Sequence, residues 1–208
     1  ALVLEANSLK DTELRTYFQK QAHQEGLTFD KGVFEELLVK SSFDFSDIQK
    51  NLAFLKGYKT EGNISSQDIM EAIPKSLQDN IFDMTQLLLR GQIQDVRELV
   101  HDLRLQGEDE IKLIAVMLGQ FRTYLQVKLL SAQGKSEQQI VSSLSDYLSR
   151  KVNPFQVRYA IRDSRHLSVA FLKTTIKTLV ETDYQIKTGT LDKDYLLDLA
   201  LLKIASNS

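Results

Sequence analysis

Two short motifs place a carboxylate and an imidazole at a spacing that can bind metal on a helix. Glu98 precedes His101 by three residues, and Asp163 precedes His166 by the same interval. In helical bundles, Glu-x-x-His pairs from two helices supply the ligands of a carboxylate-bridged metal pair. The second pair here has the shorter carboxylate and a basic neighbour. One such tetrapeptide is also expected by chance in a chain with 28 acidic residues. We therefore expect no metal site, but a solvated Glu98 and a half-buried His101.

The sequence lacks the residues and motifs that other common kinds of catalytic site require. The chain has no Cys, which excludes disulfides, thiolate metal sites, iron–sulfur clusters and a cysteine nucleophile. It also has no Gly-rich phosphate loop, dinucleotide fingerprint or Gly-x-Ser-x-Gly turn. We therefore predict that this chain is not an enzyme and needs no cofactor.

The densest positive charge lies between residues 150 and 166. Its five Lys and Arg residues are Arg150, Lys151, Arg158, Arg162 and Arg165. On a helix that begins at Pro154, Arg158, Arg162 and Arg165 are spaced by four and three residues and share one face. Such a face suits contacts with DNA phosphates. It is equally compatible with a solvated basic face, or with one that pairs with acidic residues of a partner.

The helices expected over residues 137–149 and 154–165 also resemble a helix-turn-helix. Their connection has no Gly, whereas a DNA-reading helix normally follows a tight turn of about three to four residues. A helical DNA-binding regulator that uses the Arg158, Arg162 and Arg165 face is kept as the alternative function.

The segment 183–189 has the pattern of a well-terminated helix. Asp183 and Lys187 are four residues apart, in the order that stabilises a helix, and Lys187 complements the helix dipole. Thr188 follows, and Gly189 provides a C-terminal stop.

Composition indicates what kind of scaffold carries these residues. The 208 residues include only 9 Gly and 2 Pro, about 5% together against an average near 12%. Because Gly and Pro mark turns and hairpins, this scarcity predicts an all-α fold. The hydrophobic fraction of 42% is enough for a core, and the net charge of -2 makes no case for nucleic-acid binding by the chain as a whole. No apolar run approaches the ~18 residues of a membrane span.

The pattern of apolar residues divides the chain into two helical parts. Four short helices are expected between Ser8 and Ile73, and longer, more apolar ones follow from Ser76. The last helix, Leu191–Ala205, has more apolar residues than one buried stripe requires. We interpret this excess as a contact surface for another subunit, made of Leu196, Leu197, Leu199, Leu201 and Leu202.

Several of these motifs together resemble a known family. Asp183-x-x-x-Lys187-Thr188-Gly189 is preceded by Arg165-x-Leu-Ser168-x-x-x-Leu172, and Gln120-Phe121-Arg122, Gly134-Lys135-Ser136 and Asn153-Pro154-Phe155 lie at matching positions upstream. In this order they resemble the C-terminal region of the delta subunit of the bacterial DNA polymerase III clamp loader. The segments around Asp44 and Ser65 are similar to the lid of its AAA+ module. The resemblance covers essentially the whole chain.

The resemblance implies a fragment of a cytoplasmic bacterial replication protein. Residues 1–6 would be a remnant of a strand from the missing AAA+ domain, 7–74 the small helical lid and 75–208 the larger helical collar. The collar would bind the other clamp-loader subunits, of the tau/gamma and delta-prime types. The sliding clamp, which the full-length subunit opens, would be contacted mainly by the missing domain, and primed DNA only locally. The full-length chain would be a noncatalytic component of the polymerase holoenzyme.

Overall fold

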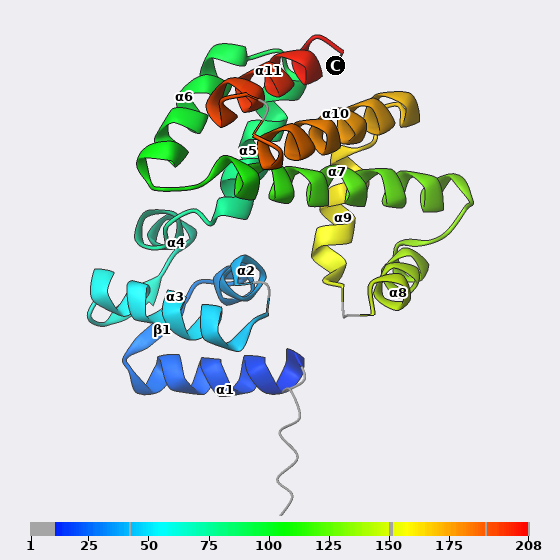
Figure 1. Cartoon of the computed structure of the whole chain (residues 1–208). Helices are drawn as coiled ribbons and strands as arrows, with labels where there is room; N and C mark the ends of the chain where they lie inside the picture. The colour runs from blue at the N-terminus through cyan, green and yellow to red at the C-terminus, as the bar shows by residue number, and fades with distance from the viewer. Residues whose placement is uncertain (1–10, 42, 150–151, 190, 208) are drawn as a thin grey trace, which may run out of the picture. The chain divides into compact units, whose positions relative to one another are not determined.

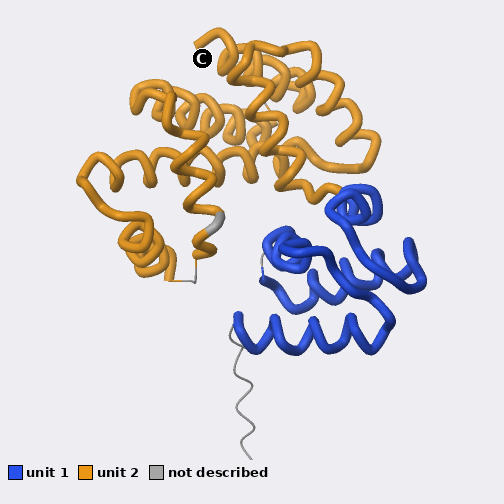
Figure 2. Tube along the Cα trace, turned by 180° about the vertical axis from the view of Figure 1, so that it is seen from behind, with its two compact units in different colours: residues 1–74 blue, residues 75–208 orange. Residues whose placement is uncertain are grey.

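The computed structural model describes residues 11–41, 43–149, 152–189 and 191–207. Eleven helices and two short strands form the regular structure of these residues, which confirms the all-α prediction (Figure 1). The chain divides into two compact units, residues 1–74 and 75–208 (Figure 2). The strand remnant expected at residues 1–6 lies outside the described residues, as do Arg150 and Lys151.

The first unit is a small helical bundle around one apolar core. Its elements are α1 (Asp11–Gln24), β1 (Leu27–Phe29), α2 (Val33–Lys40), α3 (Phe45–Tyr58), β2 (Gly62–Ile64) and α4 (Ser66–Ala72). Phe18, Leu37 and Leu55 are fully buried at its centre. The Ser65 side chain accepts a hydrogen bond from the Asp68 N–H and begins α4, as expected for an N-cap.

Two details of this unit differ from the sequence-based expectation. Strands β1 and β2 pair in parallel, with Leu27 opposite Gly62 and Phe29 opposite Ile64. Three residues are too few for the alternation of apolar and polar residues to reveal a strand. Gly57, a residue type that favours a helix end, lies inside α3, and the helix continues to Tyr58 with Lys59 as its C-cap.

The second unit is built around one long helix. Its elements are α5 (Leu77–Leu89), α6 (Ile93–Leu105), α7 (Glu110–Ala132), α8 (Glu137–Leu148), α9 (Pro154–Asp163), α10 (Val169–Lys187) and α11 (Lys193–Ala205). Helix α10 packs along α7, while α5, α6 and α11 lie toward the first half of α7, and α8 and α9 toward its other end (Figure 1). Residues Leu113, Met117 and Phe121 of α7 are fully buried, as the width of its apolar face predicts.

Polar groups fix the helices of this unit at specific points. The Ser136 side chain and Gln139 form a capping box at the start of α8, an arrangement that Ser followed by Gln three residues later favours. Within the core, the amide of Gln120 links α5 to α7. Its Oε1 lies 3.0 Å from the Thr85 hydroxyl, and its Nε2 donates to the Tyr124 hydroxyl at 2.8 Å.

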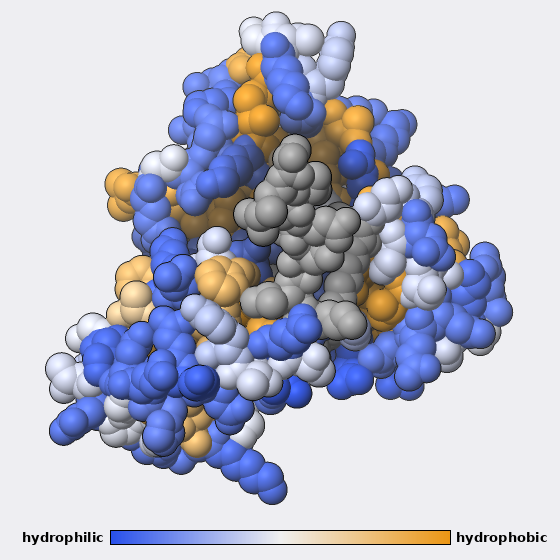
Figure 3. All heavy atoms as spheres, turned by 90° about the horizontal axis from the view of Figure 1, so that it is seen from below, coloured by the Kyte–Doolittle hydropathy of each residue, from blue (hydrophilic) through white to orange (hydrophobic). Residues whose placement is uncertain are grey.

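A membrane span requires a helix of sufficient length and apolar character. Among the described residues, no helix combines the length and the apolar character needed to cross a bilayer. On the face shown in Figure 3, hydrophilic residues predominate and the hydrophobic ones form separate patches.

Candidate functional site

The residues Asp183, Lys187, Thr188 and Gly189 form the end of α10, as predicted. Lys187 Nζ lies 2.7 Å from Asp183 Oδ2, one helical turn back. The Thr188 hydroxyl donates to the Tyr184 carbonyl oxygen at 2.9 Å, and Gly189 has a φ of 66°, in the left-handed region that Gly adopts without strain. This terminus redirects the chain from α10 toward α11, so its effect is to position the last helix.

A charged cluster fixes the start of α11 against the turn between α6 and α7. Arg104 of α6 donates to Glu110 of α7 at 2.9 Å and to the Asp198 carboxylate of α11 at 3.2 Å. Lys193, the first residue of α11, lies 2.7 Å from Glu110 and 2.8 Å from Asp109. Three helices are therefore joined through charged groups, and Glu110 is at the centre with only 3% of its side chain exposed.

The cluster holds the buried carboxylate in its charged form. Burial by itself raises the pKa of Glu110, but hydrogen bonds from Lys193, a backbone N–H and Arg104 outweigh it and lower that pKa to about 2. The pKa of Asp194 is raised, chiefly by its hydrogen bond with Glu110. The pKa of Lys193 is raised by Asp109 and Glu110. Both cations of the cluster pair with carboxylates of the same unit, so we interpret the cluster as structural.

The last helix has an inner and an outer apolar face. The prediction that all five Leu residues form a contact surface was wrong for Leu196, Leu197 and Leu201, because they are at most 3% exposed and pack inside the unit. Leu199 is half-buried and Leu202 is 49% exposed. Tyr195, which is 57% exposed, precedes these two by four and seven residues. Tyr195, Leu199 and Leu202 therefore share one face of α11, which we call the outer α11 stripe.

Only two of the three residues of the predicted arginine face lie on the same helix. Arg158 and Arg162 lie on α9, whereas Arg165 lies in the turn that follows, because α9 ends at Asp163. Arg158 Nη2 lies 2.9 Å from Glu137 of α8, and Arg162 Nε donates to Asp163 at 2.7 Å. Two of the three guanidinium groups thus pair with acidic residues of the same unit.

The two carboxylate–histidine motifs do not come together as a site. Glu98 and His101 are exposed on α6, so the expectation of a half-buried His101 was wrong. Asp163 instead pairs with Arg162, and His166 is exposed in the turn after α9. No group of three or more metal-binding side chains occurs among the residues that the structure describes.

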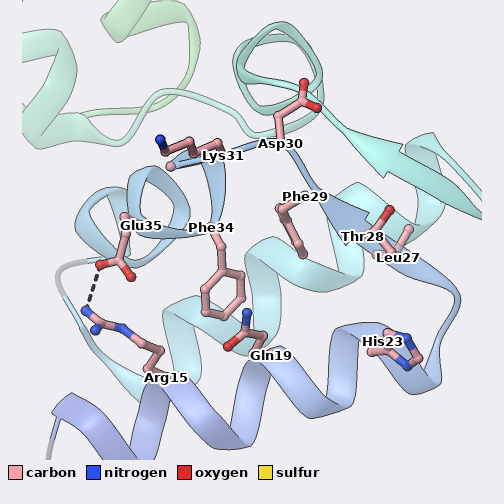
Figure 4. A pocket seen from close by; sticks show the side chains of 11 residues that line it. Arg15, Gln19, His23, Leu27, Thr28, Phe29, Asp30, Lys31, Phe34 and Glu35 are labelled. Carbon is pink, nitrogen blue, oxygen red and sulfur yellow. Dashed lines mark hydrogen bonds and ion pairs between the residues drawn. The ribbon is translucent and has the colours of Figure 1, made fainter.

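The first unit contains a shallow hollow of about 440 Å³ that sequence reasoning missed (Figure 4). It lies among α1, β1 and α2, and is lined by apolar groups such as Phe29 and Phe34. At one side, Arg15 and Glu35 form an ion pair of 2.7 Å. Asp30 and Lys31 also line it, so its positive and negative groups are balanced and it has no evident ligand class.

Comparison with known proteins gives a consistent result. Residues 78–204 match the family of the DNA polymerase III delta subunit, C-terminal domain. The DNA polymerase III subunit delta of Bacillus subtilis (strain 168) is 32% identical over 208 residues, which are 98% of this chain and 57% of that protein. The solved structure of the Bacillus subtilis DNA clamp loader delta protein superimposes with a TM-score of 0.75 and 31% identity, over 98% of this chain and 58% of that one. This chain thus spans somewhat more than half the length of these relatives, and it belongs to the DNA polymerase III delta subunit family.

Proposed function

We propose that this chain is the lid and collar of a clamp-loader delta subunit, and that its second unit binds other clamp-loader subunits through the outer α11 stripe. The supporting observation is the exposed apolar face of Tyr195, Leu199 and Leu202 on a helix whose opposite face is already buried. A helix that is apolar on both faces, in a protein related to subunits of an assembly, is well suited to pack against a second protein.

The surroundings of the stripe support the same proposal. The charged cluster around Glu110 fixes the start of α11, and Leu197, Leu201 and Ile204 pack its inner face into the core. The outer stripe is therefore presented on a rigid element, which lowers the entropy lost on binding. Its partners would be subunits of the tau/gamma and delta-prime types. Contacts with the sliding clamp would come mainly from the part of the relatives that this chain does not span.

Assembly with the other clamp-loader subunits of the same organism tests the proposal. Leu202→Glu places a charge in the outer stripe, and Leu129→Glu places one on α7, where Leu129 is 42% exposed. Size-exclusion chromatography with light scattering should show that Leu202→Glu weakens the complex at least tenfold, while Leu129→Glu leaves it intact. Thermal unfolding of each variant verifies that it is folded. Unchanged assembly of a folded Leu202→Glu variant would contradict the proposal.

A further inference from the structure

A buried carboxylate lies at the end of α9. Asp163 is the last residue of this helix, and only 7% of its side chain is exposed. Its Oδ1 accepts a hydrogen bond from Arg162 Nε at 2.7 Å. Its Oδ2 is buried and has no hydrogen-bond partner among the residues that the structure describes. A carboxylate oxygen gives up its hydration on burial, so this acceptor is costly unless a donor reaches it.

A buried donor in the same situation lies on α5. The Nε2 atom of Gln86 is buried and has no hydrogen-bond partner within the described part of the chain. Such atoms are uncommon in folded proteins, because each has lost its contact with bulk water without replacing it. Helices α5 and α9 both pack against α7, so the acceptor and the donor border the same helix.

Both groups act on the hydroxyl of Tyr124, a residue of α7 that is 3% exposed. Burial raises the pKa of Tyr124 to about 12, against an opposing effect of the hydrogen bond from Gln120. The negative charge of Asp163 raises this pKa further, and a hydrogen bond from the Gln86 side chain lowers it. The carboxylate of α9 and the amide of α5 therefore both lie near one hydroxyl group.

The contacts of Tyr124 add a second donor at this point. Gln120 Nε2 donates to the Tyr124 oxygen at 2.8 Å, so the hydroxyl acts as the acceptor in this contact. Its own proton remains to be donated, because a phenol hydroxyl can accept and donate at the same time. The position thus combines two donors, Tyr124 O–H and Gln86 N–H, with one acceptor, Asp163 Oδ2.

A water molecule matches this set of groups. Water can accept two hydrogen bonds and donate two, and buried waters typically make about three, to polar groups that would otherwise be unpaired. One molecule can accept from Tyr124 and Gln86 while it donates to Asp163 Oδ2. A metal cation does not match, because two of the three groups present hydrogens instead of lone pairs. An anion does not match either, because it would meet the charge of Asp163.

We propose that one buried water molecule binds where α5 and α9 pack on α7, held by Gln86, Tyr124 and Asp163. The polar network that begins with Thr85 and Gln120 then extends from α5 through α7 to the last residue of α9. Asp163 acts as a positioning residue in this network, since it fixes the end of α9 against the other two helices. The inference is independent of the assembly proposal, because none of these residues belongs to the outer α11 stripe.

A high-resolution crystal structure of the 208-residue chain tests the proposal directly. It should show one ordered water within about 3.2 Å of Asp163 Oδ2 and of at least one of the two donors, Tyr124 Oη and Gln86 Nε2. Asp163→Leu removes the acceptor at similar volume, so the water should be absent from crystals of this variant. A direct hydrogen bond from Gln86 or Tyr124 to Asp163 Oδ2, or the lack of a water at this position in the parent chain, would overturn the proposal.

Coupling between Tyr124 and Asp163 gives an independent measurement in solution. Tyr124→Phe and Asp163→Asn should each lower the folding equilibrium constant about tenfold in urea denaturation. Because both changes break the same water-mediated contact, the loss in the double variant should be about fivefold smaller than the product of the single losses.

The matched control combines Tyr124→Phe with Asp183→Asn, whose carboxylate pairs with Lys187 near the end of α10. Asp183 shares no partner with Tyr124 among the described residues, so these two losses should multiply to within about twofold. Equal coupling in the two pairs of variants would overturn the proposal.

Discussion

Arg104 Nε lies 2.9 Å from Glu110 Oε1, and this contact joins the end of α6 to the start of α7. The same guanidinium reaches Asp198, so one side chain connects the α6–α7 turn to the last helix. Since the outer α11 stripe is proposed to bind a partner, the rigidity of this connection bears on function as well as on stability.

Replacing Arg104 should therefore destabilise the second unit. Arg104→Met leaves Glu110 buried with one cation fewer, and we expect the free energy of unfolding to fall by about 2 kcal/mol. Urea denaturation measures this change. Arg97→Met removes an exposed cation of the same helix and should alter stability by less than about 0.5 kcal/mol. Equal effects of the two changes would show that the Arg104 cluster contributes nothing specific.

The lowered pKa of Glu110 predicts a pH dependence of stability. Its pKa falls from 4.5 in the unfolded chain to about 2 in the folded one, so the stability it contributes is fully present above pH 4.5. It is lost as the pH falls from 4.5 toward 2, because the folded state must then take up a proton. We expect Glu110→Gln to be less stable than the parent chain at pH 6, and the difference to shrink toward pH 2.

Urea titrations at several pH values measure this difference. Glu98→Gln is the control, since Glu98 is exposed on α6 and should show no such trend. A difference between Glu110→Gln and the parent that stays constant from pH 6 to pH 2 would contradict the assignment.

Two glycines should respond in opposite directions to the same substitution. Gly189 ends α10 with a φ of 66°, so Gly189→Ala forces a side chain into the left-handed region and should cost about 1 kcal/mol. Gly119 lies inside α7, and a Cβ added there meets no atom within 4 Å. Gly119→Ala should therefore stabilise the protein by about 0.5 to 1 kcal/mol, through better helix propensity. Thermal unfolding measures both, and a shift of the same sign in the two variants would contradict this reasoning.

The helices could be predicted from the sequence because each helix end depends on a few residues that are neighbours in the chain. Ser136 with Gln139 begins α8 and Gly189 ends α10, as their capping and left-handed preferences indicate. The parallel pairing of β1 with β2 depends instead on contact between Leu27 and Gly62, which are distant in sequence and leave no periodic trace.

The candidate surfaces were predicted less completely for the same reason. Arg158 was identified as part of a basic helix face, but its pairing with Glu137 depends on how α8 packs on α9. The cluster around Glu110 was missed altogether, because Arg104 and Lys193 come together only in the fold.

Substitutions on the inner face of α11 should lower the stability of the chain, whereas substitutions on its outer face should leave stability nearly unchanged. Leu197 lies on the inner face of α11 and is fully buried in the core of the second unit, whereas Leu202 is 49% exposed. Leu197→Ala opens a cavity and should lower the free energy of unfolding by about 3 kcal/mol, while Leu202→Ala should change it by less than about 0.5 kcal/mol. Urea denaturation of the isolated chain measures both. If Leu202→Ala proved as destabilising as Leu197→Ala, Leu202 would belong to the core, and the outer α11 stripe would lose the residue on which the assembly proposal chiefly depends.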